Sequence, residues 1–324
     1  LSAKFAAFAA IFGFVLPLLV LIVLLVIWLV NGDPVQIHFH MTNILPDFSK
    51  INNWVSLTAV VTAFLGVELA AVNVKDMKNP RKQYPLGVLI ASGIILLTMI
   101  LGSLAIAFVI PNKQIGLISG IFQTLNYFLD HFHLKTFAVI ICGLIVFATL
   151  GQMINWIVSP ARGLQQAAQS GSLPKILGQE NKHGMPGKVL VLQGVIVTFV
   201  CLAFVFIPSI NDVYWLLTDL STELYLFMYV LMFISALVLH YKHKHIKKGF
   251  TLKGGAFTKW CLCVLGILSC GLTIIVGFIP PSQIGFGSIG NYALIFGSGL
   301  IVLMIPAVLL ALFYKSTPEE KLLP

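Results

Sequence analysis

Long apolar segments dominate the chain, and charged or turn-forming residues separate them. Eight of these segments are long enough, at about 1.5 Å per helical residue, to cross about 30 Å of hydrocarbon. A helix satisfies its own backbone hydrogen bonds in lipid, so the sequence predicts an all-α, polytopic membrane protein. We expect a single transmembrane domain, residues 1–324. Its predicted spans lie at about 8–30, 53–74, 86–110, 135–160, 188–207, 212–240, 258–280 and 290–314.

Composition excludes several other classes of protein. Hydrophobic residues make up 58% of the chain and charged residues 10%, outside the range of soluble domains. The net charge of +9 does not indicate a nucleic-acid partner, because the basic residues recur between apolar segments. No phosphate-binding loop or nucleophile elbow is present, so we expect no enzyme activity and no cofactor. The lipid bilayer is the expected environment.

The cysteines and histidines do not predict a metal site. All five cysteines fall inside predicted spans, which argues against a disulfide framework. His38-x-His40 and His131-x-His133 lie in predicted loops, where solvated histidines are far more common than metal ligands. No metal ion is therefore expected, and the role of the two histidine pairs stays open.

The distribution of lysine and arginine predicts the orientation of the chain. Of 20 such residues, only Lys50, Lys113 and Lys135 lie on one face, and all others lie in the alternate loops or at the termini. Basic residues concentrate on the cytoplasmic side, which places both termini in the cytoplasm. On the opposite side, residues 116–123 are apolar enough for a short helix lying across the outer face.

The span at 53–74 contains a glycine and a carboxylate near the middle of the bilayer. Gly66 and Glu68 follow one another at a depth where a charge is costly and usually functional. A glycine at that point indicates an interrupted helix whose backbone groups face a ligand. The alternative is a glycine that lets two helices pack, beside a glutamate bonded to a neighbour. We also expect Pro17 and Pro306 to kink their helices.

The span at 212–240 carries a polar stripe. Thr218, Thr222, Tyr225 and Tyr229 recur at three- and four-residue steps and share one face. Lipid offers no hydrogen-bond partner, so this stripe predicts one wall of a solute pathway or, alternatively, helix–helix bonding. Asp219 and Glu223 form an acidic pair on an adjoining face and are candidate coupling residues.

The end of the span at 135–160 has a second polar line. Gln152, Asn155 and Ser159 fall on one face of a helix. Their side chains include donors and acceptors, which suits a zwitterionic solute. Bonding between helices explains the same pattern equally well.

Several of these motifs, in this order and spacing, resemble a known family of transporters. Gly66-Val67-Glu68, then Lys78-Asn79-Pro80-Arg81 and Tyr84-Pro85, resemble the broken sixth helix and following loop of the amino acid–polyamine–organocation superfamily. Ser159-Pro160-Ala161-Arg162-Gly163 resembles its eighth helix, and Ser172-Leu173-Pro174-Lys175 the loop that follows. The chain is most similar to bacterial glutamate/γ-aminobutyrate antiporters, up to about residue 250.

The resemblance implies a partial inverted-repeat (LeuT-like) transporter fold with eight transmembrane helices. The span at 8–30 corresponds to the fifth helix of that fold, so the first four are absent from this sequence. A missing N-terminal segment or a separate chain would supply them. A bacterial relative of this kind lies in the inner membrane as a multi-pass protein.

The resemblance also implies an antiporter that exchanges glutamate, glutamine or a similar amino acid for a related product. Gly66 and Glu68 would contact the solute, and Gln152 and Asn155 would line the site. Tyr225 and Tyr229 match two tyrosines near the family's substrate and would gate the pathway. Gln152 stands where these antiporters are expected to have a glutamate. Two alternatives stay open: a proton-coupled or facilitative amino-acid permease, and a non-transporting membrane fragment or scaffold.

Overall fold

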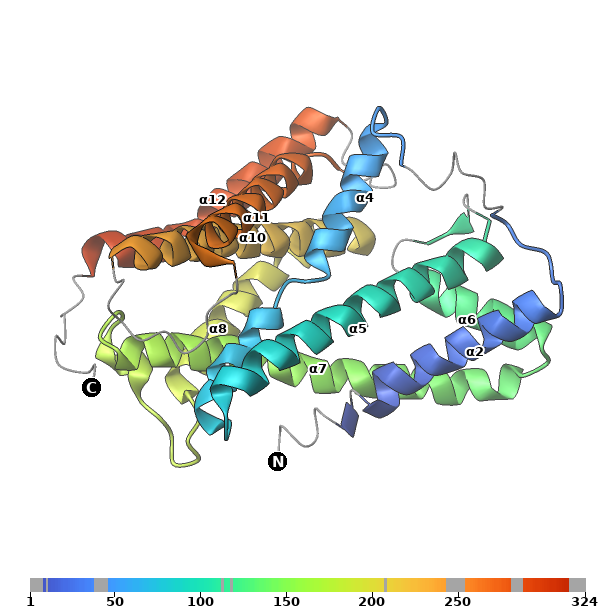
Figure 1. Ribbon diagram of the computed structural model, residues 1–324, viewed down its shortest axis with the longest axis horizontal. Helices are drawn as coiled ribbons and strands as arrows, with labels where there is room; N and C mark the ends of the chain where they lie inside the picture. Colours follow the sequence, from blue (N-terminus) through green and yellow to red (C-terminus); the bar gives the residue numbers. More distant parts are fainter. Residues whose placement is uncertain are drawn as a thin grey trace.

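Helices are the only regular elements in the part of the chain that the computed structural model describes, which is residues 8–9, 11–37, 46–111, 114–116, 119–206, 209–242, 254–280 and 288–314. The α-helices are accompanied by one π-helix, η1, and two 3₁₀-helices, η2 and η4 (Figure 1). In chain order the elements are η1 (Ile11–Val15), α2 (Leu16–Val30), α4 (Ile51–Thr62), η2 (Val67–Asp76), α5 (Pro80–Val109), α6 (Gly120–His131), α7 (Lys135–Gln169), η4 (Lys175–Gly178), α8 (Gly187–Cys201), α9 (Ala203–Phe206), α10 (Ile210–Lys242), α11 (Gly255–Gly277) and α12 (Ile289–Phe313).

The all-α, membrane-spanning architecture predicted from the sequence is confirmed. Seven described segments are long and apolar enough to cross a bilayer. The predicted span at 188–207 is built differently: α8 has 15 residues, and a turn at Leu202 separates it from the four-residue α9. The count of eight spans and the orientation of the termini stay predictions.

Helix α7 is longer than the sequence predicts. The predicted span ends at 160, but the helix continues through Pro160 to Gln169. The extension persists because its buried face packs on the following loop and its amides bind that loop and η2. Gln165 donates to the Glu180 carboxylate at 3.1 Å, and Gln166 donates to the carbonyl of Val72 at 3.2 Å.

The helices form two groups, and the broken segment α4–η2 runs between them (Figure 1). One group contains α2, α5, α6 and α7, and the other contains α10, α11 and α12. Helix α4 packs against α11 of the second group, whereas η2 packs against α5 and α7 of the first. The two halves of the predicted span at 53–74 therefore belong to different groups.

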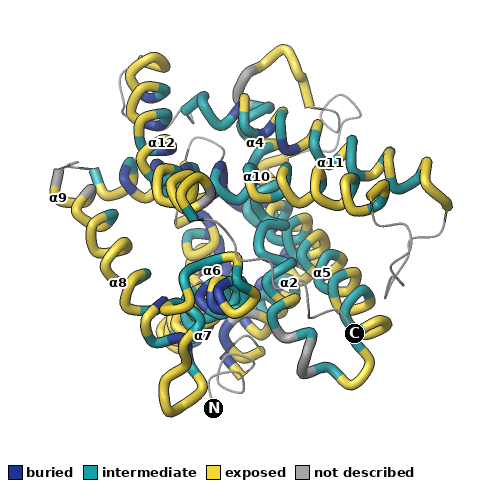
Figure 2. The backbone as a smooth tube through the Cα atoms, turned by 90° about the vertical axis from the view of Figure 1, so that its left-hand side faces the viewer, coloured by how far each residue is buried: buried dark blue, intermediate teal, exposed yellow. Residues whose placement is uncertain are grey.

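The first group is held together by a core around Trp28. This side chain is 2% exposed and packs against Phe128 of α6, with ring centroids 5.6 Å apart. Its indole nitrogen donates to the carbonyl of Pro34 at 3.3 Å. Most outward surfaces of the long helices are exposed in Figure 2, as expected for helices that face lipid, while α6 turns a buried face inward.

Replacing Trp28 with alanine is expected to lower the free energy of unfolding by about 3–5 kcal/mol, because the cavity left behind removes many packing contacts. Thermal unfolding in detergent measures the effect. Trp260 on α11 is 47% exposed and serves as a control, for which the Trp260→Ala change should cost much less. Equal losses for the two variants would contradict this description of the core.

A short helix occurs near the segment 116–123, where the sequence predicts one, but it is displaced along the chain. Helix α6 begins at Gly120 and ends at His131, and residues 117 and 118 lie outside the described part of the chain. Leu125, Phe128 and Leu129 fix it there because they enter the core around Trp28. The place of this helix on the outer face stays a prediction. The His131 imidazole lies 3.3 Å from the Asp33 carboxylate, and His38 and His40 lie outside the described residues.

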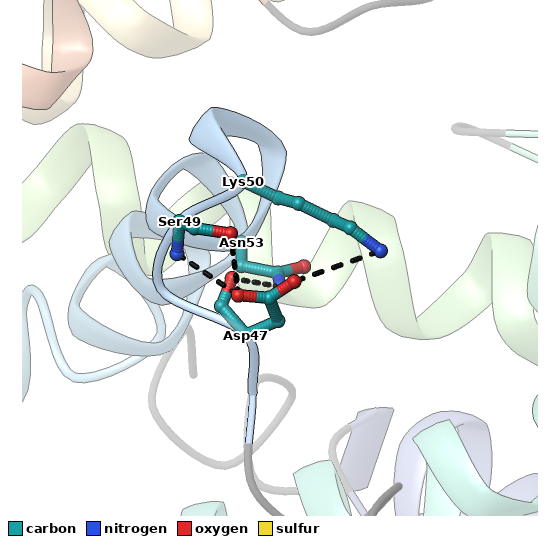
Figure 3. A network of polar contacts seen from close by, with 4 residues as sticks. All are labelled: Asp47, Ser49, Lys50 and Asn53. Carbon is teal, nitrogen blue, oxygen red and sulfur yellow. Dashed lines mark hydrogen bonds and ion pairs between the residues drawn. The ribbon is translucent and has the colours of Figure 1, made fainter.

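A small polar network precedes α4 (Figure 3). The Asp47 carboxylate accepts hydrogen bonds from the hydroxyl of Ser49 at 2.6 Å and from its backbone N–H at 3.1 Å. These bonds, with Lys50 at 3.7 Å, hold the pKa of Asp47 below its usual value. Asn53 donates to the Asp47 carbonyl at 2.7 Å, which fixes the first turn of α4.

Candidate functional site

The predicted interruption beside Gly66 is confirmed. Helix α4 ends at Thr62, and the N–H groups of Phe64 and Leu65 bond three residues back instead of four. Gly66 has a φ of 89°, in the left-handed region that favours glycine, and η2 begins at the next residue. The regular helical hydrogen bonds are therefore lost within an otherwise apolar membrane segment.

A chain of hydrogen bonds joins this break to α10. The backbone N–H of Gly66 donates to the hydroxyl of Tyr229 at 3.1 Å. That hydroxyl in turn donates to Oε2 of Glu68 in a short hydrogen bond. The other carboxylate oxygen, Oε1, is buried and has no hydrogen-bond partner among the residues that the structure describes. Glu68 thus has one oxygen bonded to Tyr229 and one without a hydrogen-bond partner among these residues.

Three aromatic rings surround the break. Trp156 of α7 covers Gly66 so closely that a Cβ atom there would lie 2.8 Å from its ring atom Cη2. The Trp156 ring meets Tyr225 edge-on at 6.0 Å between centroids, and Tyr225 meets Tyr229 in the same way at 6.5 Å. These contacts join η2, α7 and α10, so the break lies where both helix groups meet.

A cavity of about 330 Å³ opens beside the break. This volume falls at the small end of the range for ligand sites and is suited to a small solute. Its walls come from η2, the glycine before it and α7. They are formed by Gly66, Leu69, Ala70, Asn155, Trp156 and Ser159.

The structure brings most of the predicted site residues together. Gly66 and Asn155 line the cavity, and Glu68, Tyr225 and Tyr229 surround the break next to it. Gln152 does not belong to the cavity wall: it is exposed, one turn before Asn155 on the same face of α7.

The acidic pair on α10 lies elsewhere. Asp219 accepts a hydrogen bond from Tyr292 of α12, and Glu223 lies against the end of α11. The pair is therefore directed toward helices other than those that form the cavity.

Trp156 is the site residue that sequence reasoning missed. It stands next to Asn155 in an apolar segment, where a tryptophan is most simply read as lipid-facing. Only the contact with Gly66, some 90 positions earlier in the chain, reveals its place in the cavity wall. No local pattern signals such a contact.

The arrangement can hold a solute that carries both charges. The end of a helix exposes carbonyl groups with partial negative charge, and the start of the next exposes N–H groups with partial positive charge. The break supplies both ends beside the half-buried carboxylate of Glu68. The ammonium group of a zwitterionic amino acid can bind the carbonyl groups at the end of α4 and the carboxylate of Glu68. Its carboxylate can bind the N–H groups at the start of η2.

Comparisons with known proteins agree with this arrangement. The family model described as amino acid permease matches residues 1–305. An uncharacterized transporter of Legionella pneumophila is 35% identical over 302 residues, 93% of this chain and 65% of the relative. A glutamate/gamma-aminobutyrate antiporter of Lactococcus lactis strain IL1403 is 30% identical over 317 residues, 97% of this chain and 62% of the relative. A probable agmatine/putrescine antiporter of the same strain is 22% identical over 197 residues, 60% of this chain and 42% of the relative.

The chain spans 62 to 65% of the length of the first two relatives. These proteins are named as transporters, in agreement with the prediction that the chain is not an enzyme. The match covers the broken helix, the cavity and the tyrosines of α10. The chain belongs to the amino acid permease family, within the amino acid–polyamine–organocation superfamily.

Proposed function

We propose that the complete protein is an amino-acid antiporter of a bacterial inner membrane that works by alternating access. The observation that carries the proposal is Glu68, a carboxylate at a break in a membrane helix with one oxygen fixed by Tyr229 and one without a partner among the described residues. A cavity large enough for an amino acid lies beside it. Burying a half-satisfied carboxylate is costly, and a solute ammonium group would relieve that cost.

The proposed substrates are glutamate, glutamine or a similar amino acid, exchanged for a decarboxylated or deamidated product. Support comes from the two lactococcal relatives named as glutamate/gamma-aminobutyrate antiporters, each 30% identical to this chain. The polar groups of Asn155 and Ser159 in the cavity wall suit the solute carboxylate. Gln152, just outside the wall, would select the solute as it enters.

Tyr229 is proposed to act as a gate. Its hydroxyl bonds both Gly66 and Glu68, so it connects α10 to the break in one step. Because α4 and η2 pack on different helix groups, a change in this connection would alter how the groups meet. That is the kind of movement that alternating access requires.

Replacing Tyr229 with phenylalanine is expected to slow exchange by about 10- to 150-fold. The ring and its contact with Tyr225 stay, but two hydrogen bonds are lost, one of them to a carboxylate, at a cost of about 1.5–3 kcal/mol. Uptake of labelled amino acid into proteoliposomes measures the change. The matched control is Tyr241→Phe on the same helix, whose 56% exposed side chain lies outside the site. An equal effect at both positions would contradict the gating role.

Counter-flow separates the antiporter from a proton-coupled or facilitative permease. The full-length protein is reconstituted into vesicles that contain glutamate, γ-aminobutyrate or no solute, with equal pH on both sides. An antiporter takes up external labelled glutamate only when solute is present inside. Equal uptake into empty vesicles would show a permease, and no uptake under any condition would favour the non-transporting alternative.

A further inference from the structure

A second buried polar cluster lies on α10, directed away from the cavity. Glu223 is only 1% exposed, and Asp219 precedes it by one helical turn. The hydroxyl of Tyr292, a fully buried residue of α12, donates to Oδ2 of Asp219 at 2.7 Å. The cluster therefore lies between α10 and the helices α11 and α12.

Glu223 is not paired with a positive charge in the part of the chain that the structure describes. Its Oε2 is buried and has no hydrogen-bond partner there. Its Oε1 occupies the space beside Gly277, so closely that a Cβ atom at Gly277 would overlap it. Thr273, the nearby buried hydroxyl of α11, already donates to the carbonyl of Ser269 at 2.9 Å.

The groups around Glu223 oppose a negative charge. Its electrostatic neighbours are Asp219, four residues earlier on the same helix, and Tyr292 on α12. Helix α11 approaches Glu223 with its C-terminal end at Gly277, where helix carbonyls carry partial negative charge. The buried residues of α11, Cys270, Thr273 and Val276, carry no positive charge. Helix α9, which also contacts α10, contains no titratable residue.

We propose that Asp219 and Glu223 form a proton-binding site between α10, α11 and α12, with the proton on Glu223. Two carboxylates one turn apart in a low-dielectric interior cannot both be ionised without a compensating cation. A protonated carboxyl group does not need a donor at both oxygens, and the carbonyls at the end of α11, which Oε1 approaches at Gly277, can accept its hydrogen. Asp219 keeps the negative charge, because the hydroxyl of Tyr292 bonds it.

A proton fits this cluster better than a metal cation does. Sodium or calcium ions need several oxygen ligands arranged around one point. No group of three or more histidine, cysteine or acidic side chains that could hold a metal occurs among the described residues. A proton needs only one carboxylate oxygen and one acceptor.

The site is placed to link protonation to transport, a link that rests on the proposed function. Helix α10 carries Tyr225 and Tyr229 toward the cavity and Glu223 toward α11. Loss of the proton would put two negative charges in the interface of α10 with α11 and α12. Their repulsion would move α10, and with it the Tyr229 hydroxyl that bonds Gly66 and Glu68.

Infrared spectroscopy of the purified full-length protein tests the proton site without measuring transport. A buried carboxylic acid gives a C=O band that shifts in D₂O, and we expect such a band at neutral pH. The band from Glu223 should be lost in Glu223→Gln and retained in Asp219→Asn and in the control Asp212→Asn, which removes an acid from the start of α10. An unchanged band in Glu223→Gln would overturn the proposal. If that variant does not fold, Glu223→Asp takes its place, and a C=O band whose frequency is unchanged in Glu223→Asp would overturn the proposal.

Exchange in proteoliposomes at a series of pH values tests the link to transport. The wild-type rate should depend on pH, and Glu223→Gln, which imitates the protonated form, should lose this dependence, whereas Asp212→Asn keeps it. An unaltered pH profile in Glu223→Gln would overturn the link. A wild-type protein that shows the infrared band but no exchange at any pH would refute the proposed function and leave the proton site supported.

Discussion

Replacing Glu68 with glutamine is expected to reduce exchange by about 10- to 150-fold or more. The change keeps the shape of the side chain but removes the charge that would bind the solute ammonium group. It also weakens the bond from Tyr229. A hydrogen bond to a charged group contributes about 1.5–3 kcal/mol, and each 1.4 kcal/mol is about tenfold in affinity. Uptake of labelled substrate into proteoliposomes containing the full-length protein measures the loss.

Glu180→Gln is the matched control for this experiment. Glu180 accepts a hydrogen bond from Gln165 at 3.1 Å, outside the cavity, and an amide oxygen can accept the same bond. The control variant should therefore exchange at the wild-type rate. Uptake by Glu68→Gln that equals that of the wild type would remove Glu68 from the site.

Replacing Gly66 with alanine is expected to have a similarly large effect by a different route. A left-handed conformation costs a residue with a Cβ atom about 1–2 kcal/mol. The new Cβ atom would also lie 2.8 Å from Cη2 of Trp156, so the ring must move and the cavity wall with it. Both the thermal stability in detergent and the exchange rate should fall.

Gly87→Ala on α5 is the matched control, because it has neither the left-handed conformation nor the close contact. It is the same change in a regular helix, at a glycine with no atom within 4 Å of the added methyl group. Alanine in a helix is more stable than glycine by about 0.5–1 kcal/mol, so this variant should be at least as stable as the wild type. A Gly66→Ala protein that unfolds and exchanges like Gly87→Ala would show that neither the backbone conformation nor the contact with Trp156 matters.

Local sequence signals predict the break but not its partners. A carboxylate beside a glycine in the middle of an apolar membrane segment is costly, so Gly66 and Glu68 are identified as candidate site residues from the sequence alone. The bond between Tyr229 and Glu68 joins residues 161 positions apart. Helical spacing places Tyr229 on a polar face, yet it does not specify which helix that face meets.

Packing overrides local signals in two other places. The span predicted from the sequence ends at 160, but α7 continues to Gln169 because glutamines in the extension bind Val72 and the following loop. The spacing of Asp219 and Glu223 predicts a shared face. It does not reveal that α11 and α12 cover that face, because this depends on how three separate helices pack.

The most direct test of the account is whether substrate protects the cavity. All native cysteines of the full-length protein, five of which lie in this chain, are first replaced, and Ser159→Cys is introduced into the cavity wall. Ser170→Cys, at the exposed end of the same helix, is the control. The rate of labelling by a thiol reagent is then measured in the full-length protein with and without glutamate. The account predicts that glutamate slows labelling at Ser159→Cys only. Labelling that is unaffected by glutamate in a variant that still exchanges it would contradict a solute site in this cavity.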